Sequence, residues 1–586
     1  MTAPDVREGL IKVLDILLLV VSLLAVVSLV AEYGFYLTPA REMMIHRINV
    51  IIVWYFVLQS LIRLILVPHR WSYFKSHWFE YVIVLLILSE TVIFVRHTGL
   101  GIVRQFLSGK GVVQITKIYI IAFQVTILLS LIAHSPSLNQ KIASYRFHPA
   151  QILMGSFLII ILVGTGLLLL PRAVVPGKSL GPLNALFTAT SATCVTGLIV
   201  VDTGAHFSRL GQLIILGLIQ LGGLGLMTYA SFFALILRRS ISLREKSLLR
   251  EMLNYENIGL ISRLLTSTVI STFVIEAVGA VFLFWGFSGL SLSVGERIYS
   301  AIFHSISAFC NAGFSLFSTS FMQFQNNYLV VLTLATLIIL GGVGFPVLVN
   351  LFGKWDSQMP SGRRWLSVQT RLVLGISGVL LLLGTVFVLY SESGGALSGM
   401  SWPQKLLNAF FQSVTTRTAG FNTVDIGIIS SPTVLFFILL MFIGASPGST
   451  GGGIKTTTIG ILFAGVFSVI KGRNRIELFH RNIPFTVLNR ALVILLFSLS
   501  FVFVSILILS FTEDLPLLDI IFEEFSAFGT VGLSRGITPF LSDIGKWVII
   551  VSMFFGRLGA LTISLAITAP REIYHYDYPP ENVMVG

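Results

Sequence analysis

Charged residues are scarce in this chain: they make up 11% of its 586 residues, whereas hydrophobic residues make up 55%. The mean hydropathy is correspondingly high, at +0.90. An average soluble domain has about 25% charged residues. This composition excludes an ordinary soluble fold and predicts a protein embedded in a lipid bilayer. The net charge of +13 comes from Lys and Arg between the apolar runs, which favours membrane topology over nucleic-acid binding as its explanation.

The chain has two cysteines, Cys194 and Cys310, which are too few for a disulfide framework. We interpret both as small residues that pack behind a loop, in preference to redox or metal chemistry. The N-terminus does not resemble a cleavable signal peptide, because acidic residues precede its first apolar run and no small-residue cleavage site follows.

Convergent His, Asp or Glu side chains are missing from the apolar runs, where Glu276 stands as an isolated acid. A membrane enzyme would need such a cluster, or a set of metal ligands. We therefore expect no enzymatic activity and no covalently bound cofactor.

A short motif centred on glycine occurs four times in the chain. The glycines are Gly197, Gly313, Gly420 and Gly532, at spacings of 116, 107 and 112 residues. Each follows a short run rich in Ser, Thr and Phe, and each precedes Leu or Phe. Recurrence at a nearly constant period predicts a repeated architecture.

Two long apolar runs flank each motif. They fall at about 150–170 and 210–237 in repeat A, 265–288 and 327–350 in repeat B, 370–391 and 432–470 in repeat C, and 487–511 and 545–567 in repeat D. A helix needs about 20 residues to cross the hydrocarbon, so these runs can cross, whereas the roughly 10–12 residues before each glycine must enter and return. Two crossings per repeat give all four repeats one orientation, so the four glycine segments meet on one side.

Four further apolar runs precede the repeats, at roughly 10–30, 47–67, 79–95 and 112–133. The predicted fold is an all-α integral membrane protein with four repeats around a pseudo-fourfold pore, preceded by four extra transmembrane helices. Each repeat has a membrane helix, a pore helix and a second membrane helix. The predicted boundaries are 1–140 for the N-terminal extension, 141–250 for repeat A, 251–362 for repeat B, 363–480 for repeat C, and 481–586 for repeat D with the C-terminal tail.

Basic segments join the repeats, and the positive-inside rule places them in the cytoplasm together with the N-terminus. The basic residues in question are Arg238, Arg239, Arg244, Lys246, Arg250, Lys354, Arg363, Arg364, Arg371, Lys471, Arg473, Arg475 and Arg481. The predicted location is a cell membrane, crossed many times and in contact with lipid.

Glycine at the four motif centres is typical of a backbone that coordinates an ion through its carbonyl oxygens. A side chain there would project into the ion path or forbid the conformation that aims carbonyls at it. Carbonyl oxygens from four segments can replace the water around a potassium ion. Helix packing is the alternative role for these glycines. The predicted potassium filter consists of Thr193, Cys194, Val195, Thr196, Gly197, Phe309, Cys310, Asn311, Ala312, Gly313, Thr416, Arg417, Thr418, Ala419, Gly420, Phe528, Gly529, Thr530, Val531 and Gly532.

The four motifs, with SATCVTGL around Gly197 and TTRTAGFNTVD around Gly420, resemble the Trk/Ktr/HKT superfamily of potassium transporters. The resemblance covers about 150–570. In that superfamily glycine in all four motifs accompanies potassium preference, and serine in the first accompanies sodium transport. The resemblance therefore implies a pore-forming potassium subunit that is a homodimer. It also implies control by a cytoplasmic nucleotide-binding ring from another chain, since no Gly-x-Gly-x-x-Gly unit in a strand–helix context occurs here.

The second apolar run of repeat C is interrupted at 444–455 by glycines and a proline, which cannot hold a regular helix. A phosphate-binding loop does not fit, because Ile454 separates the last glycine from Lys455. A simple helix kink is one interpretation. The resemblance implies an intramembrane gating loop here, with Gly444, Gly448, Gly451, Gly452, Gly453 and Lys455 as candidate gate residues.

Arg557 lies inside an apolar run of repeat D. A charge at that depth costs roughly 2.5–3.5 kcal/mol on insertion scales, so it should face a wet cavity or a partner. By resemblance Arg557 forms an electrostatic barrier near the gating loop; a structural salt bridge is the alternative.

Asp202 and Asp425 each follow their glycine by five residues. Both are candidates for an outer mouth that concentrates cations, with local turn capping as the alternative. His304 and Glu523 each precede their glycine by nine residues, and we interpret them as packing or hydrogen-bonding residues.

The N-terminal runs resemble voltage-sensor domains more weakly, through Phe56, Gln59, Arg63, Pro68, Phe74 and Glu80. Gln59 stands where that pattern has an acid, and the fourth run lacks basic residues at every third position. A peripheral scaffold is therefore favoured over a voltage-responsive protein.

The predicted function is potassium uptake through a gated, channel-like pore. The rival function is a symporter that couples potassium to sodium or protons. It would need ionisable groups in the path, where Arg557 is the evident candidate.

Overall fold

The computed structural model describes residues 3–67, 70–76, 81, 84–85, 149–225, 261–352, 366–473 and 475–559. The predicted apolar run at 112–133, most of the run at 79–95, and Glu80 lie outside these residues. So do the basic residues between 238 and 250, Lys354, Arg363, Arg364 and the C-terminal tail.

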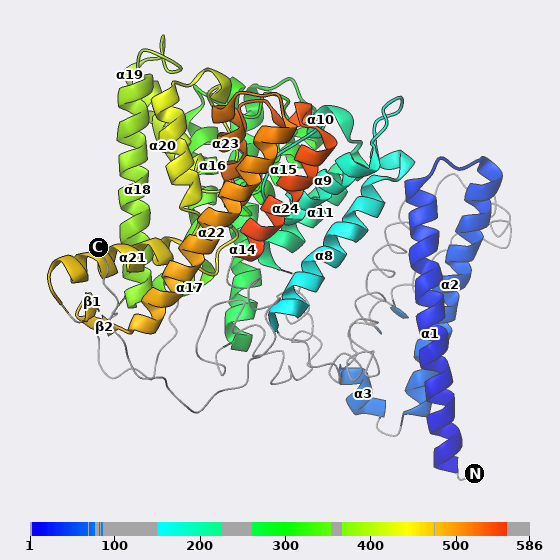
Figure 1. The fold of residues 1–586 in the computed structure, drawn as a ribbon. Helices are drawn as coiled ribbons and strands as arrows, with labels where there is room; N and C mark the ends of the chain where they lie inside the picture. Colours follow the sequence, from blue (N-terminus) through cyan, green and yellow to red (C-terminus); the bar gives the residue numbers. More distant parts are fainter. Residues whose placement is uncertain are drawn as a thin grey trace.

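Helices of three kinds follow one another four times along the chain (Figure 1). The long first helices are α8 (Pro149–Leu168), α14 (Ile261–Gly286), α18 (Val368–Glu392) and α22 (Phe485–Thr512). The short helices before each glycine motif are α9 (Pro182–Thr193), α15 (Val294–Phe309), α19 (Trp402–Thr415) and α23 (Leu517–Gly529). The helices after each motif are α11 (Arg209–Leu224), α16 (Tyr328–Val343), α20 (Ser431–Phe442) and α24 (Asp543–Leu558).

Local sequence signals start the short helices. Ser293 and Glu296 form a capping box at the start of α15, and Ser401 and Gln404 form another at α19. Pro182 occupies the first position of α9, where its missing N–H costs no hydrogen bond.

Six helices in the described part of the chain are long and apolar enough to cross a membrane, or seven if the bent pair α16–α17 counts as one span. The six include α1 and α2 of the N-terminal extension and the four long first helices. Their outer faces are apolar and exposed, as at Leu382 in α18 and Phe503 in α22, which suits contact with lipid.

Breaks interrupt the helices that follow the motifs. The predicted interruption in repeat C is present, since α20 ends at Phe442 and α21 begins at Thr456 (α21, Thr456–Ile470). The prediction of one continuous span at 327–350 is wrong, because α16 and α17 (Phe345–Phe352) meet at Gly344 with a bend of 100°. Gly225 and Gly559 directly follow the ends of α11 and α24, and both have a φ of 83°.

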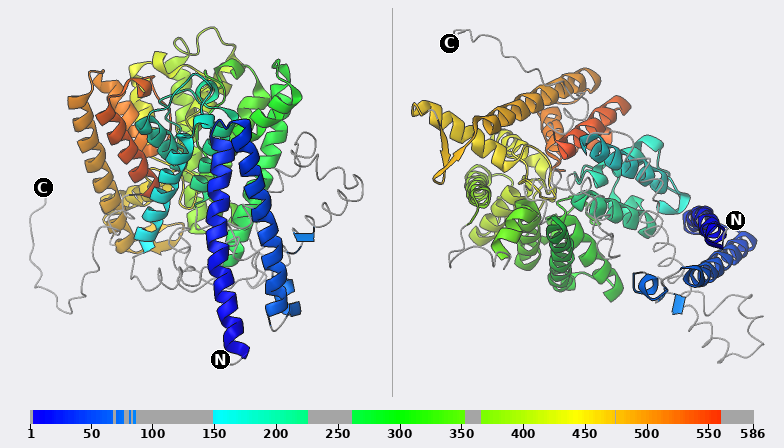
Figure 2. Two further views of the ribbon diagram at one scale, coloured as in Figure 1. Left: turned by 90° about the vertical axis from the view of Figure 1, so that its right-hand side faces the viewer. Right: turned by 90° about the horizontal axis from the view of Figure 1, so that it is seen from below.

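The four repeats surround one centre, as the view from below in Figure 2 shows. Four buried apolar clusters join neighbouring repeats. They include Ile215 with Phe303 (A and B), Leu334 with Phe411 (B and C), Phe437 with Phe522 (C and D), and Phe187 with Ile549 (D and A). Burial of apolar surface therefore holds the four repeats in a closed ring.

The N-terminal helices α1 (Ala3–Gly34) and α2 (Pro39–Leu66) form a pair beside repeat A (Figure 1). Buried side-chain hydrogen bonds join the two helices: Asn49 donates to Glu32 at 2.6 Å and accepts from Ser28 at 2.7 Å. Arg172 of repeat A donates to the carbonyl of Glu32 at 3.0 Å. Gln59 of α2 is buried.

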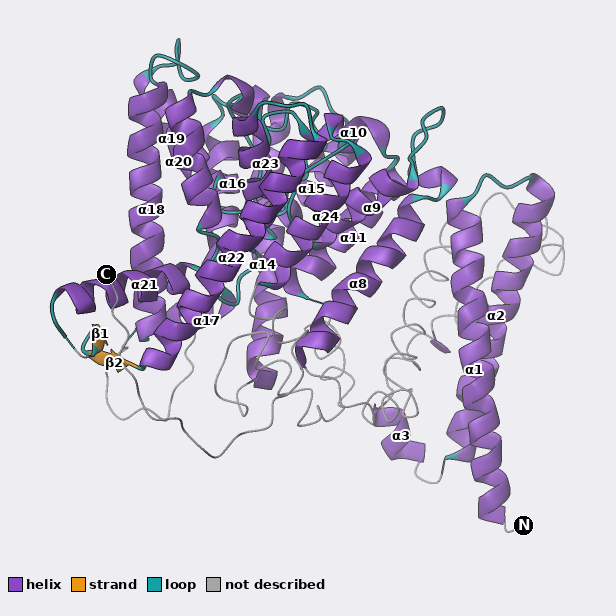
Figure 3. Ribbon diagram, viewed as in Figure 1, coloured by secondary structure: helices purple, strands orange, loops and turns teal. Residues whose placement is uncertain are grey.

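Small elements complete the described chain. They are α3 (Arg70–Ser76), α10 (Thr203–His206), and an antiparallel hairpin of β1 (Ile476–Leu478) and β2 (Arg481–Ile483) between α21 and α22. Short 3-10 helices also occur, namely η1 (Pro171–Ala173), η3 (Phe287–Gly289), η4 (Met322–Phe324), η5 (Ile426–Ile428) and η6 (Thr538–Phe540). Figure 3 shows that loops run between the helices of the four repeats as well as along their ends.

Candidate functional site

The four motif glycines meet at one place, in their order along the chain. A Cβ atom added to any of them would collide with the carbonyl oxygen of the residue before the next glycine. The added Cβ would lie 2.5 Å from the Ala312 oxygen at Gly197, 2.9 Å from the Ala419 oxygen at Gly313, 2.6 Å from the Val531 oxygen at Gly420, and 2.1 Å from the Thr196 oxygen at Gly532. The last pair closes the ring, so four carbonyls gather around a centre that leaves no room for side chains.

Left-handed backbone recurs at two positions in each motif. φ is positive at the four glycines (94°, 70°, 77° and 87°) and at the residues two positions earlier: Val195 (58°), Asn311 (59°), Thr418 (70°) and Thr530 (49°). The residue between each pair is not left-handed. Alternation of this kind turns successive carbonyls toward one side of a segment. A non-glycine residue held there costs of order 1–3 kcal/mol, so surrounding contacts must maintain it.

Hydrogen bonds from the short helices supply those contacts. The amide before each glycine donates to a carbonyl near the end of the preceding helix: Thr196 to Ser191 (2.8 Å), Ala312 to Ser307 (2.8 Å), Ala419 to Thr415 (3.0 Å) and Val531 to Ser526 (2.8 Å). The hydroxyls of Ser191 and Ser526 also accept from the glycine amides at 3.1 Å. The short helices therefore fix the segments that follow them.

The loop between α20 and α21 lies against these segments. The Gly452 amide donates to the Thr530 hydroxyl at 3.0 Å, and the Thr450 hydroxyl donates to the Phe309 carbonyl at 3.2 Å. A Cβ on Gly451 would lie 2.2 Å from the Thr418 hydroxyl. The loop thus touches motifs of repeats B, C and D, and its glycines permit the close approach.

The other predicted gate glycines shape this loop. Gly448 and Gly453 have φ of 68° and 69°. A Cβ on Gly444 would lie 2.1 Å from the Gly452 carbonyl, so the two ends of the loop pack directly together.

Arg557 ties the loop to repeat A. Its guanidinium donates to the carbonyl of Thr450 in the loop and to the carbonyls of Gly222 and Gly223 at the end of α11. Among the described residues no carboxylate pairs with Arg557, so the salt-bridge interpretation is not supported there. Arg557 also lies over the ring of Phe157.

Two more basic side chains of the site have different surroundings. Lys455 donates to the Gly451 carbonyl at 2.7 Å, so it lies within the loop as expected. Arg417 lines a small cavity with Leu381 of α18 and Val414 of α19. Its buried Nε finds no acceptor in the described part of the chain.

Glu276 has two polar partners from other elements, and in the described part of the chain no further acidic residue or histidine joins it. Its carboxylate accepts from the Gln220 amide at 3.2 Å and lies 3.9 Å from the thiol of Cys310. The residues come from α14, α11 and the motif of repeat B. No spacing pattern reveals this cluster, because its members are brought together by helix packing alone. Cys310 and Cys194 are both buried, in agreement with packing behind a loop.

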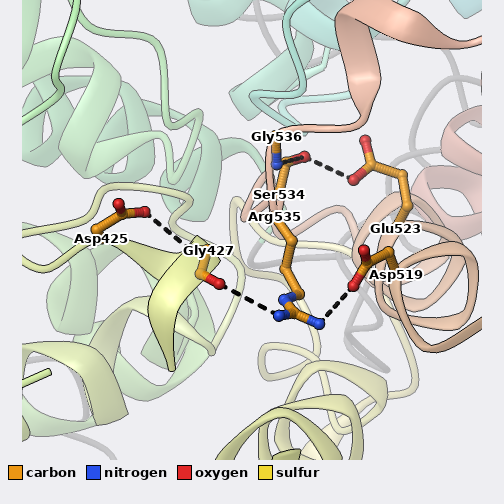
Figure 4. Close-up of polar contacts among 7 residues, drawn as sticks. All are labelled: Asp425, Gly427, Asp519, Glu523, Ser534, Arg535 and Gly536. Atoms are coloured by element: carbon orange, nitrogen blue, oxygen red, sulfur yellow. Dashed lines mark hydrogen bonds and ion pairs between the residues drawn. The ribbon is translucent and has the colours of Figure 1, made fainter. Parts of the chain in front are cut away.

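The predicted outer-mouth residues act as local caps. Asp202 accepts from the Ala205 amide at 2.6 Å, and Asp425 accepts from the Gly427 amide at 2.8 Å. His304 and Glu523 are hydrogen-bonded, as expected: His304 contacts the Ser300 carbonyl at 2.7 Å, and Glu523 accepts from Ser534 at 2.7 Å. Figure 4 shows Asp425 and Glu523 on either side of Arg535, a residue not singled out from the sequence.

The chain is similar to several known transport proteins. The TrkH family model, described as a cation transport protein, matches residues 114–574. The chain is 40% identical over 451 residues to the Ktr system potassium uptake protein B of Bacillus subtilis (strain 168), covering 75% of this chain and 97% of that protein. It is 38% identical over 458 residues to the potassium/sodium uptake protein NtpJ of Enterococcus hirae, covering 77% and 100%.

Among solved structures, the crystal structure of the potassium transporter TrkH from Vibrio parahaemolyticus is similar, with a TM-score of 0.55 and 22% identity. The match covers 71% of this chain and 85% of that one. At this identity the likeness supports the fold alone.

Proposed function

This chain belongs to the TrkH family of cation transport proteins, and we propose that it takes up potassium across a cell membrane through a selective pore. The relatives described above are named as potassium uptake proteins, and a transporter needs none of the catalytic clusters of a membrane enzyme. In the proposed pore, one ion path is surrounded by repeats A to D, at 141–250, 251–362, 363–480 and 481–586. The extension at 1–140 is a peripheral addition.

The observation that carries the proposal is the closed ring of four glycines and the carbonyls of Thr196, Ala312, Ala419 and Val531. Carbonyl oxygens are the ligands that replace water around potassium in selective filters. The four short helices end at this ring, so the negative ends of their dipoles favour a cation there. The twenty motif residues are the proposed filter.

The loop at 444–455 is the proposed gate. It packs against three motifs and is held by Arg557, whose positive charge opposes the passage of cations. Movement of the loop would open the path, and the membrane potential supplies about 2.3 kcal/mol per charge for each 100 mV to drive inward flux. Asp202 and Asp425 belong to the proposed outer mouth in addition to their capping contacts.

Regulation and assembly are proposed from the family. A cytoplasmic ring of nucleotide-binding subunits from another chain controls the loop, and two copies of this chain form a homodimer in the membrane. The basic segments that join the repeats face the cytoplasm, and so does the N-terminus.

A potassium symporter coupled to sodium or protons is the second candidate. The name of the Enterococcus hirae relative, a potassium/sodium uptake protein, favours a role for sodium. Potassium uptake that depends on an imposed sodium or proton gradient would support coupling over a simple pore.

The proposed filter is tested by potassium and sodium flux in liposomes that contain the purified protein, comparing wild type with Gly420→Ser. We expect the substitution to relax potassium selectivity, because its Cβ would lie 2.6 Å from the Val531 carbonyl at a φ of 77°. Gly399→Ser is the matched control, since Gly399 has the same φ of 77° but no atom within 4 Å of an added Cβ. Selectivity that is unchanged in Gly420→Ser, or relaxed equally in both variants, would contradict selection by the carbonyl ring.

A further inference from the structure

Repeat D carries a positive charge just beyond its filter glycine. Arg535 follows Gly532 by three residues, whereas Val200, Leu316 and Thr423 hold that place in the other repeats. The mouth of the proposed pore is therefore charged asymmetrically.

Contacts from two repeats position the Arg535 guanidinium (Figure 4). It donates to the carboxylate of Asp519 at the start of α23 and to the carbonyl of Gly427, 3.2 Å away, in the loop after the filter of repeat C. The Gly427 amide is held in turn by Asp425 at 2.8 Å. Arg535 thus joins the outer loops of repeats C and D.

The loop that carries Arg535 is itself firmly held. Ser534 donates to Glu523 at 2.7 Å and accepts from the Gly536 amide at 3.0 Å. The hydroxyl of Thr538 also donates to Glu523. These bonds fix the backbone on both sides of Arg535, so its charge occupies a constant position relative to the filter.

We propose that Arg535 limits the affinity for external potassium by placing a fixed positive charge at the mouth, with Asp519 as the counter-charge that offsets it. The inference rests on the proposed pore. The side chains of Arg535 and Asp519 are only 19% and 17% exposed. The field of such fixed charges extends into the adjoining water, where it acts on an approaching ion and where ionic strength sets its range.

Two variants separate charge from structure, because both break the same ion pair. Arg535→Gln leaves the mouth more negative, and Asp519→Asn leaves it more positive. Potassium uptake is measured over a range of external potassium in cells that lack their own uptake and express the full chain. We expect KM to fall about threefold in Arg535→Gln and to rise about threefold in Asp519→Asn, with Vmax little changed. The double variant should return KM toward the wild-type value.

Salt and a conservative variant complete the test. Added choline chloride should shrink the difference in KM between the two single variants, because salt screens charge. Arg535→Lys should keep KM near that of wild type, since it keeps the charge. KM shifts in one direction for both single variants, or shifts that choline chloride leaves unchanged, would overturn the inference while leaving the pore intact. Absence of saturable potassium uptake in cells that express the wild-type chain together with its cytoplasmic subunit would instead contradict the proposed function.

Discussion

At the scale of single residues, charge inside the membrane is the strongest signal in this sequence. The sequence predicts that Arg557 needs polar surroundings, and the structure supplies three backbone carbonyls, from Gly222, Gly223 and Thr450. These acceptors could not be predicted, because every residue carries a carbonyl and only packing selects among them. The same holds for Gln220, the partner of Glu276.

Removal of the Arg557 charge should increase potassium uptake. Arg557→Gln takes away both the repulsion of cations and the strong tether between the loop and α11. We expect Vmax to rise about tenfold, equivalent to roughly 1.4 kcal/mol off the barrier. The measurement is initial uptake into cells that lack their own potassium transport.

Arg557→Lys provides the matched control for that variant. It keeps the positive charge but cannot reach three carbonyls with a planar fork. An intermediate Vmax would indicate that charge and tether both contribute. Uptake in Arg557→Gln equal to or below that of wild type would contradict the barrier.

At the scale of elements, the helices after the motifs differ most from expectation. The sequence predicts the interruption at 444–455 from its glycines and proline, yet it treats 327–350 as one helix. The signal was present, since Gly341, Gly342, Gly344 and Pro346 lie close together there. The bend brings α17 to the loop, where the Phe345 amide donates to the Gly448 carbonyl at 2.9 Å.

Because the chain bends at Gly344 against the loop, we expect Gly344→Ala to destabilise the protein by more than the cost of backbone strain. A Cβ there would lie 2.6 Å from the Pro447 carbonyl, at a φ of 95°. Gly399→Ala shares a positive φ but has open space around it. We expect a left-handed alanine to cost about 1 kcal/mol at both positions, with a further loss of roughly 1–3 kcal/mol at Gly344 from the collision. Thermal unfolding in detergent measures the stability of both variants. Equal losses of Tm would show that the loop at 444–455 does not pack against Gly344.

At the scale of the whole molecule, the repetition of one motif predicts that the four glycines lie around a common centre. Four copies with two expected crossings each can place four glycines on one side, and the structure brings those glycines together in cyclic order. The closure depends on contacts between residues more than 100 positions apart, such as Gly532 with Thr196, which no local pattern encodes. The docking of α1 on repeat A through Arg172 is likewise a product of tertiary packing.

The most direct test of the account is to locate the ion. Crystals of the protein grown with rubidium in place of potassium would show the ion by its anomalous scattering. The account predicts a peak at the centre of the ring, in contact with the carbonyl oxygens of Thr196, Ala312, Ala419 and Val531. Rubidium peaks elsewhere in the molecule, with none among these four carbonyls, would contradict it.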